Sequence, residues 1–169
     1  MTKQKGFSLI ELLIVVAIIL IIAAIAIPNL LSARKSANES SAVGSLRTIN
    51  TGEVSFQGKH NAYTCTLADL GPAPGDNYID ANLAGAIAAG TAKSGYFYQP
   101  GACGAAVAIP PAIAPVTTPV VSYEWSTSPA NLGVTGNQGF CTDTSAVIWK
   151  NIAGSGAACL AANPRVPIG

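Results

Sequence analysis

A long apolar run organises the first part of the chain. Sixteen apolar residues follow one another without a break over residues 12–27. Together with the residues just ahead of them they form a stretch of 21 residues, 7–27, and about 20 apolar residues span a bilayer as a helix. A single carboxylate, Glu11, stands immediately before the run. Because a charged side chain at the centre of a membrane span costs about 2.5–3.5 kcal/mol, Glu11 predicts a function that needs its charge.

Beyond Pro28 the apolar positions recur at steps of three and four, which is the period of an amphipathic helix. The predicted apolar stripe consists of Leu30, Leu31, Ala33, Ala37, Val43, Leu46, Ile49 and Phe56. The predicted polar face consists of Arg34, Lys35, Asn38, Glu39, Ser40, Arg47, Asn50 and Glu53. We expect one long helix from Phe7 to about Gly58, whose second half carries a globular domain on its stripe.

The remaining pattern predicts a small sheet and several loops. Alternating or aromatic segments predict an antiparallel meander of three or four strands, at residues 95–99, 122–126, 139–143 and 146–150. Its apolar face should lie on Leu46, Ile49 and Phe56. We expect a turn of helix at residues 66–70. Residues 83–89 should form a short helix or a loop. A loop of polyproline character is predicted for residues 104–121, with Pro110, Pro111, Pro115 and Pro119.

Two ordinary interpretations of the N-terminus leave Glu11 unexplained. A cleaved secretory signal has an apolar core of about 7–15 residues and a small-residue exit, whereas this run is longer and leads into Pro28. A simple membrane anchor fits in length, and Lys3 and Lys5 would hold the N-terminus in the cytoplasm. The cations just after the run, at residues 34–35, weaken this asymmetry without reversing it.

A third interpretation accounts for the carboxylate. The segment that precedes and opens the run resembles the class III signal of type IV pilins and related pseudopilins: Gly6-Phe7-Ser8-Leu9-Ile10-Glu11-Leu12. In that family a membrane peptidase cuts after the glycine, here Gly6, and the new N-terminal residue, here Phe7, is N-methylated. The glutamate, here Glu11, pairs with the N-terminal amine of a neighbouring subunit during assembly. A helix-bending proline also recurs in the family, so the resemblance implies a helix break at Pro28. It covers about residues 1–35.

The resemblance implies an α+β fold of the lollipop type, with a long N-terminal helix packed on a small antiparallel sheet. Residues 1–6 would be a leader that is removed. Residues 7–58 would form the helix, with 7–27 as its transmembrane and filament-core part. Residues 59–169 would form a globular β domain with long loops.

The implied function is that of a structural subunit of a type IV pilus, built from copies of itself. Its other partners would be the prepilin peptidase and methyltransferase, an inner-membrane assembly platform, and the membrane before assembly. The chain would move from the inner membrane to an extracellular filament, and adhesion, motility or DNA uptake would be properties of the fibre. The alternative is a pseudopilin of a type II secretion system, which uses the same signal and helix.

Charge and cysteine usage fit an extracytoplasmic domain. Cleavage after Gly6 would leave 163 residues with seven basic and eight acidic side chains, which does not favour a nucleic-acid-binding protein. Four cysteines lie beyond the apolar run, on the side where disulfides persist: Cys65, Cys103, Cys141 and Cys159. Three connectivities are open. We favour 65–103 and 141–159 because each pair closes a local loop, and a C-terminal bridge recurs in many type IV pilins.

No residue pattern indicates an enzyme, a cofactor or a metal site. His60 has no accompanying nucleophile, so we expect a surface histidine. Asp69, Asp76 and Asp80 lack the spacing of an EF-hand and predict a solvated acidic loop, although a calcium loop here would favour the pseudopilin. The lack of a catalytic pattern also disfavours a membrane-anchored enzyme or binding module.

The aromatic residues and one Asn-x-Ser triplet do not indicate a further function. The tyrosines and tryptophans predict sheet core rather than a nucleic-acid platform, because no basic groove accompanies them. Residues 38–40, Asn-Glu-Ser, fit an N-glycosylation acceptor, but such triplets are common by chance.

Overall fold

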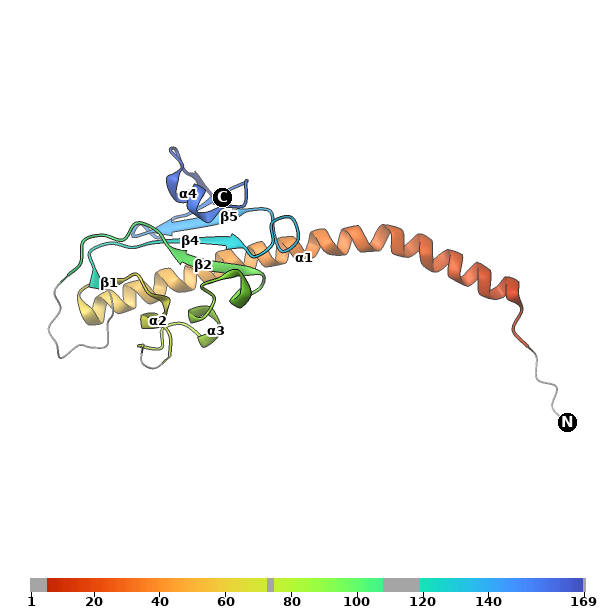
Figure 1. The fold of residues 1–169 in the computed structure, drawn as a ribbon, viewed down its shortest axis with the longest axis horizontal. Coiled ribbons are helices and arrows are strands. Elements are labelled where there is room, and N and C mark those ends of the chain that lie inside the picture. Colours follow the sequence, from red (N-terminus) through yellow and green to blue (C-terminus); the bar gives the residue numbers. More distant parts are fainter. Residues whose placement is uncertain (1–5, 73–74, 108–118, 169) are drawn as a thin grey trace. The chain divides into compact units, whose positions relative to one another are not determined.

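The computed structural model describes residues 6–72, 75–107 and 119–168. The chain divides into two compact units, Met1–Arg34 and Lys35–Gly169 (Figure 1). Most of the predicted leader, with Lys3 and Lys5, and the central part of the proline-rich segment, with Pro110, Pro111 and Pro115, lie outside the described residues.

Helix α1, Leu9–His60, is 52 residues long and contributes to both units. It begins two residues after the predicted start at Phe7 and ends two residues beyond Gly58. Lys59 and His60 occupy its last turn, where positive charge is favourable because the helix dipole is negative there. Asn61 follows with a φ of 57°, a left-handed conformation that commonly ends helices.

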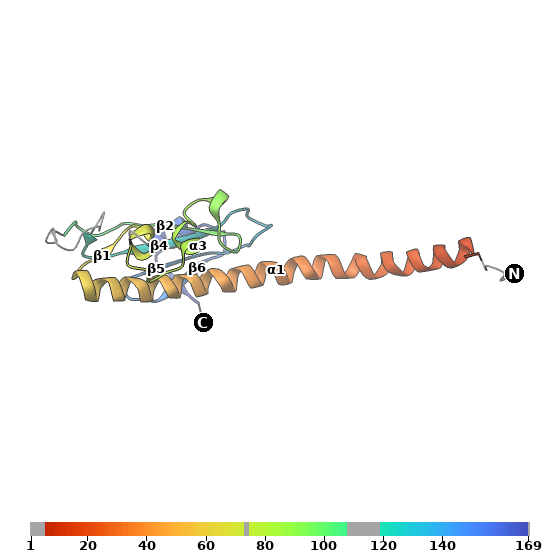
Figure 2. The same ribbon diagram turned by 90° about the horizontal axis from the view of Figure 1, so that it is seen from below.

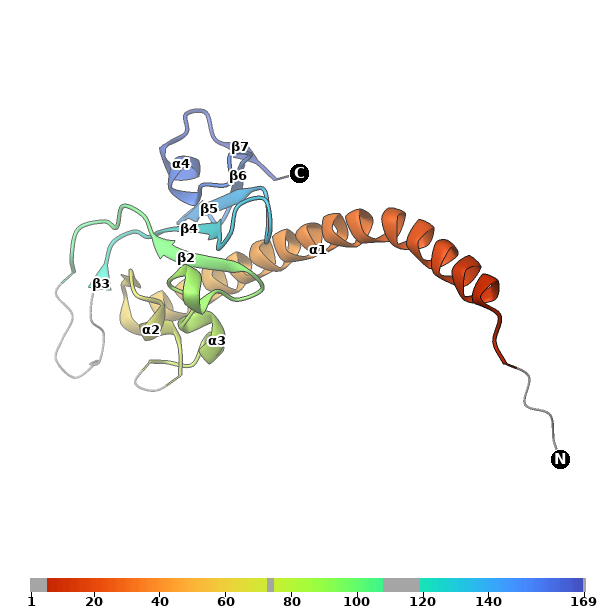
Figure 3. The same cartoon turned by 45° about the vertical axis from the view of Figure 1, so that its right-hand side comes forward.

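A five-stranded antiparallel sheet forms the centre of the second unit, with the order β2-β4-β5-β6-β7 (Figure 3). Its strands are β2 (Tyr96–Pro100), β4 (Glu124–Pro129), β5 (Gly139–Asp143), β6 (Ile148–Asn151) and β7 (Val166–Pro167). The predicted α+β fold, a long N-terminal helix followed by a small antiparallel sheet, is therefore confirmed. The pattern does not predict β7, because a two-residue strand that ends in proline carries no alternation.

Short elements complete the unit. They are β1 (Tyr63–Thr64), α2 (Leu67–Leu70), α3 (Ala81–Ala84), the 3₁₀ turn η1 (Ala89–Thr91), β3 (Pro119–Val120) and α4 (Gly156–Ala161). The predicted turn of helix at residues 66–70 is α2. The predicted polyproline loop is wrong at its ends, since Val107 N donates to Pro119 O at 2.8 Å and Gly104 N to Ser122 O at 2.9 Å. β3 also pairs with β1.

One face of the sheet packs on α1 (Figure 2). Leu46 and Ile49 are fully buried and Phe56 is almost so, as the predicted stripe requires. Opposite them lie side chains that alternate along the strands: Tyr96, Tyr98, Trp125 and Phe140. Burying one large apolar side chain contributes about 1.5–3 kcal/mol, so this layer is the main attachment of the sheet to the helix.

The opposite face of the sheet is covered by α4 (Figure 1). Cys141 of β5 points to this side, because its neighbours Phe140 and Thr142 point towards α1. The α4 helix approaches β4 closely at Gly156, where a Cβ would come within 2.7 Å of Thr127 N. Glycine is therefore needed for the close packing of α4 on the sheet.

Candidate functional site

The described part of the N-terminal unit presents an exposed apolar surface. Large side chains from Phe7 to Leu31 are exposed, Phe7 and Leu9 to 79% each. Within the described residues α1 is the one helix long and apolar enough to cross a membrane, and none of its most apolar window is buried. Such a surface needs lipid or other protein around it, because contiguous exposed apolar area marks an interaction site.

Glu11 lies in the first turn of this helix and already has a partner within the chain. Its Oε2 accepts a hydrogen bond from Ser8 N at 3.0 Å. The residue before the helix and the third residue inside it thus form half of a capping box, the Ser-x-x-Glu pattern at residues 8–11. This capping pattern is present in the sequence and is independent of the charge of Glu11. Gly6, at the predicted cleavage junction, has no atoms near the position of a Cβ.

The predicted helix break at Pro28 is wrong. α1 is helical on both sides of Pro28 and through it. A proline inside a helix removes one backbone hydrogen bond and costs about 3 kcal/mol. Strong helix formers on both sides, Leu, Ile and Ala among them, allow the helix to absorb one such loss.

The four cysteines form two disulfides, Cys65–Cys103 and Cys141–Cys159, which is the connectivity we favoured. The first joins the segment after β1 to the segment after β2, across 38 positions of sequence. The second joins β5 to α4, across 18 positions. Each closes a loop within the second unit.

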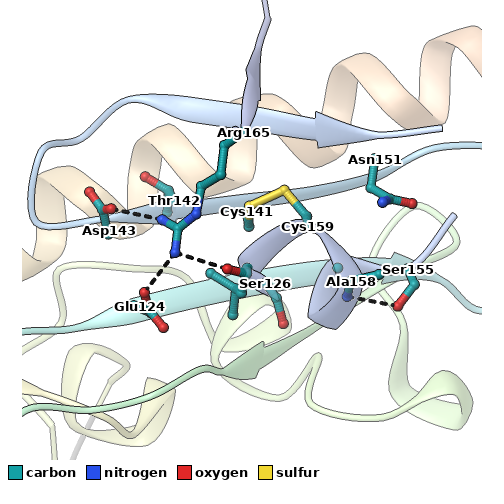
Figure 4. Close-up of a disulfide and its surroundings, with 12 residues drawn as sticks. Glu124, Ser126, Cys141, Thr142, Asp143, Asn151, Ser155, Ala158, Cys159 and Arg165 are labelled. Atoms are coloured by element: carbon teal, nitrogen blue, oxygen red, sulfur yellow. Dashed lines mark hydrogen bonds and ion pairs between the residues drawn. A yellow bond between two sulfur atoms is a disulfide. The ribbon is translucent and has the colours of Figure 1, made fainter. Parts of the chain in front are cut away.

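Arg165 fastens the C-terminal segment beside the second disulfide (Figure 4). Its guanidinium donates to Asp143 Oδ2 at 2.9 Å, to Glu124 Oε1 at 3.1 Å and to the Leu160 carbonyl at 3.0 Å. It also lies over the Trp149 ring, 5.0 Å from the centroid. Arginine suits this position because its planar fork bonds several oxygens at once and stacks on an aromatic ring. No pattern in the sequence predicts this cluster of contacts.

His60 and the three aspartates do not form the surface predicted for them. His60 is buried, stacks on Phe56 at 4.3 Å between ring centroids, and pairs through Nε2 with Asp76. Asp76 also pairs with Lys59. Asp80 caps α3 through Leu83 N and pairs with Lys93, while Asp69 is buried and accepts from Thr64 Oγ1 at 2.8 Å. The predicted surface histidine is wrong, and the predicted solvated loop is wrong for the buried Asp69, whereas Asp80 is exposed as predicted.

These carboxylates are therefore used one by one, in separate contacts. Over residues 6–72, 75–107 and 119–168 there is no group of three His, Cys, Asp or Glu side chains placed to hold a metal ion.

Two residues assigned to the polar face of α1 are buried against the sheet. Asn50 Nδ2 donates to Thr142 Oγ1 at 2.9 Å, and Asn50 Oδ1 accepts from Tyr123 Oη at 3.3 Å. Glu53 accepts from Trp125 Nε1 at 2.8 Å and from Thr64 N at 3.0 Å. The polar-face prediction fails here because each buried oxygen and nitrogen finds a partner, which removes the cost of burial.

Burial raises the pKa of Glu53 from 4.5 to about 7. The bonds from Thr64 and Trp125 lower it, and the nearby charge of Asp69 raises it further. The carboxylate thus changes its charge near neutral pH in the layer that joins α1 to β4.

A second polar contact holds the loop between β4 and β5 on α1. Asn38 Nδ2 donates to Thr135 O at 2.8 Å. Glu39 Oε1 accepts from Asn137 N at 2.8 Å and from Gln138 N at 3.2 Å. The Asn38 amide and the Glu39 carboxylate thus attach this loop to α1.

The chain is similar over its N-terminal part to a known family and is also similar to two curated relatives. Residues 1–27 match the family described as "Prokaryotic N-terminal methylation motif". The chain is 49% identical over 70 residues to "Type IV wide pilus major component PilA4" of Thermus thermophilus, which covers 41% of this chain and 53% of that protein.

A second relative is "Type IV major pilin protein PilA" of Myxococcus xanthus, with 42% identity over 72 residues, 43% of this chain and 33% of the relative. The matches thus span about half or less of these relatives. No solved structure matches the chain with comparable significance.

Proposed function

We propose that this chain is a type IV pilin, a structural subunit of a type IV pilus rather than an enzyme. The observation that carries the proposal is the exposed apolar part of α1, which begins directly after the Gly6–Phe7 junction and holds one carboxylate, Glu11, in its first turn. The relatives that support it are named as major pilus components.

Processing would convert the membrane segment into an assembly segment. A leader with Lys3 and Lys5 cannot enter an apolar filament core, and cleavage after Gly6 replaces it with the α-amine of Phe7, which is then methylated. In an apolar surrounding neither this amine nor Glu11 is stable alone, and pairing them between neighbouring subunits offsets the cost. The charge pair would therefore select a correctly docked copy.

The second unit would be displayed by the fibre. Two disulfides and the Arg165 contacts suit a domain that works outside the cell, where no chaperone can refold it. Before assembly the chain would be held in the inner membrane, where the prepilin peptidase, the methyltransferase and the assembly platform act on it. Adhesion, motility or DNA uptake would then be properties of the assembled fibre.

A pseudopilin of a type II secretion system would use the same N-terminus. A calcium loop would have favoured it, but Asp76 and Asp80 are paired with lysine side chains and Asp69 is buried. No contact of the described residues favours this second function, so the pilus is the stronger proposal.

Electron microscopy of sheared cell-surface material tests the function directly. Cells that make the chain should carry long fibres decorated by an antibody against the second unit. Cells without the chain, or with Gly6→Val, should lack them. A wild-type surface free of long decorated fibres, with the chain abundant in the membrane, would refute the pilus assignment.

A further inference from the structure

A groove runs along the side of α1 in the second unit. Its volume is about 470 Å³, within the usual range of about 300–1,000 Å³ for ligand sites. A second hollow of about 250 Å³ shares Arg47 and Ile168 with it. Arg47 therefore stands between two adjoining hollows, on the part of α1 that carries the sheet.

Two cations in the groove form no ion pair with any described residue. In the described part of the second unit, Lys59, Lys93 and Arg165 are ion-paired, whereas Arg47 and Lys150 in the groove and Lys35 outside it form no ion pair. Apart from Glu39, the described carboxylates of the second unit are ion-paired or buried: Asp76, Asp80, Glu124, Asp143, Glu53 and Asp69. The two cations of the groove are thus available to a ligand.

Glu39 is the carboxylate that lines the groove, and it is committed to the β4–β5 loop. Its Oε1 accepts from two successive backbone amides, Asn137 N and Gln138 N. These bonds fix the rim on which the Gln138 side chain stands. With two cations, Arg47 and Lys150, and one carboxylate, Glu39, the lining carries one excess positive charge.

Apolar and hydrogen-bonding surfaces alternate around the cations. Val43 and Ile168 supply apolar surface, while Ser36, Ser40 and Gln138 supply hydroxyls and an amide. Ser40 Oγ donates to Ser36 O at 2.9 Å, so its lone pairs remain free to accept. This mixture suits a sugar ring, whose C–H face packs on apolar surface while its hydroxyls donate and accept at the edge.

We propose that this groove binds an acidic oligosaccharide, with a uronic-acid carboxylate held between Arg47 and Lys150. Arginine can bond a carboxylate through two parallel N–H groups, and lysine adds a point charge. A nucleic acid fits less well, because Phe140 is the aromatic residue that lines the groove and it is only 4% exposed, which leaves no platform for base stacking. The proposal adds a ligand class to the proposed pilus subunit and is tested on the subunit itself.

The test measures binding of trigalacturonate to the full chain in a neutral detergent, at physiological salt, by calorimetry. We expect saturable binding that weakens about tenfold or more in Arg47→Gln and in Lys150→Gln, since a hydrogen bond to a charged group is worth about 1.5–3 kcal/mol. Lys35→Gln is the matched control, because it removes the same charge from α1 outside the groove. Its affinity should stay within about twofold of the wild type. Arg47→Lys keeps the charge and should fall between wild type and Arg47→Gln.

Several outcomes would overturn the site. They are an absence of saturable binding, an equal loss in Lys35→Gln, equal affinity for the neutral maltotriose, or displacement of the sugar by a single-stranded oligothymidylate at equal concentration. Assembled fibres should bind trigalacturonate as the free chain does, and loss of binding on assembly would assign the groove to a neighbouring copy instead. Fibre formation is scored separately by microscopy, so failure of the sugar site leaves the pilus assignment in place.

Discussion

Glu11 combines two properties, a hydrogen bond that caps α1 and a negative charge that another subunit could pair with. Its carboxylate accepts from Ser8 N, which satisfies one of the unpaired donors at the start of α1. Its charge is the feature that an α-amine of another subunit could use. Glutamine also serves at this position of a capping box, so the cap and the charge can be separated by substitution.

Glu11→Gln and Glu11→Ala should therefore behave alike in assembly and differently in the helix. Both lose the charge, and we expect both to be cut after Gly6 but to enter fibres at less than about a tenth of the wild-type level, since a lone buried amine costs several kcal/mol. Helix content of the chain in micelles should fall only in Glu11→Ala. Wild-type fibre yield from Glu11→Gln would show that the hydrogen bond, and not the charge, drives assembly.

Gly6→Val should leave the precursor uncut. The junction at Gly6 is open, with no atoms around the position of a Cβ, so the substitution does not disturb the chain's own packing. The intact mass of the chain from membranes should then equal that of the precursor, while wild type loses residues 1–6. A normally shortened Gly6→Val product would contradict the assignment of the signal.

The joint between α1 and the sheet is held by polar contacts inside an apolar layer. Glu53 accepts hydrogen bonds from Trp125 of β4 and from the backbone of β1, and Asn50 donates a hydrogen bond to Thr142 of β5. Buried polar groups of this kind fix the alignment of two elements, because a shifted helix would leave them without partners. Helical periodicity could not predict these contacts, since it assigns Asn50 and Glu53 to solvent by residue type.

The pKa of Glu53, about 7 in the fold against 4.5 as its ordinary value, makes the stability of the second unit pH-dependent. Between these values the folded state binds more protons than the unfolded state, so the free energy of unfolding falls as pH rises from about 4.5 to about 7 and is then level. The fall is at most about 3 kcal/mol, from about 1.4 kcal/mol per pKa unit. Tryptophan fluorescence during urea unfolding of the full chain in micelles measures it.

Glu53→Gln should remove this slope, because an amide does not titrate in that range. Trp125→Phe removes the hydrogen bond from Trp125 that lowers the pKa of Glu53. The free energy of unfolding should then continue to fall to a higher pH than in the wild type. A wild-type chain with stability that rises between pH 4.5 and 7 would contradict the assignment, as would an unchanged slope in Glu53→Gln.

Across the chain, the two disulfides limit how far the second unit can open. Loop-closure entropy predicts about 3 kcal/mol for Cys141–Cys159 and about 4 kcal/mol for Cys65–Cys103, whose loop is longer. The double substitution Cys65→Ser/Cys103→Ser should lower the free energy of unfolding more than Cys141→Ser/Cys159→Ser does. In the latter variant the contacts of Arg165 still hold the C-terminal segment on the sheet, which also makes its loss of stability the smaller one. The reverse order would show that contacts and not loop length decide.

The sequence supports different parts of the account to different degrees. Residues 6–12 predict the assembly segment because the signal is local and each residue type has a task. Strand β5 appears at its predicted bounds, whereas the alternating segment 122–126 predicts only the first half of β4. The ion pairs of the buried His60 and of Arg165 could not be predicted, because the carboxylates that pair with them lie 16 or more positions away and no period relates them. Pro28 was misjudged because the strength of the surrounding helix outweighs one lost bond.

The central claim is that fibres are built from this chain after cleavage at Gly6 and methylation of Phe7. Mass spectrometry of peptides from purified fibres tests it most directly. We expect an N-terminal peptide that begins at Phe7 and carries one methyl group on its amine, with Glu11 unmodified. Fibres whose peptides begin at Met1, or fibres that lack this chain while it remains in the membrane, would contradict it.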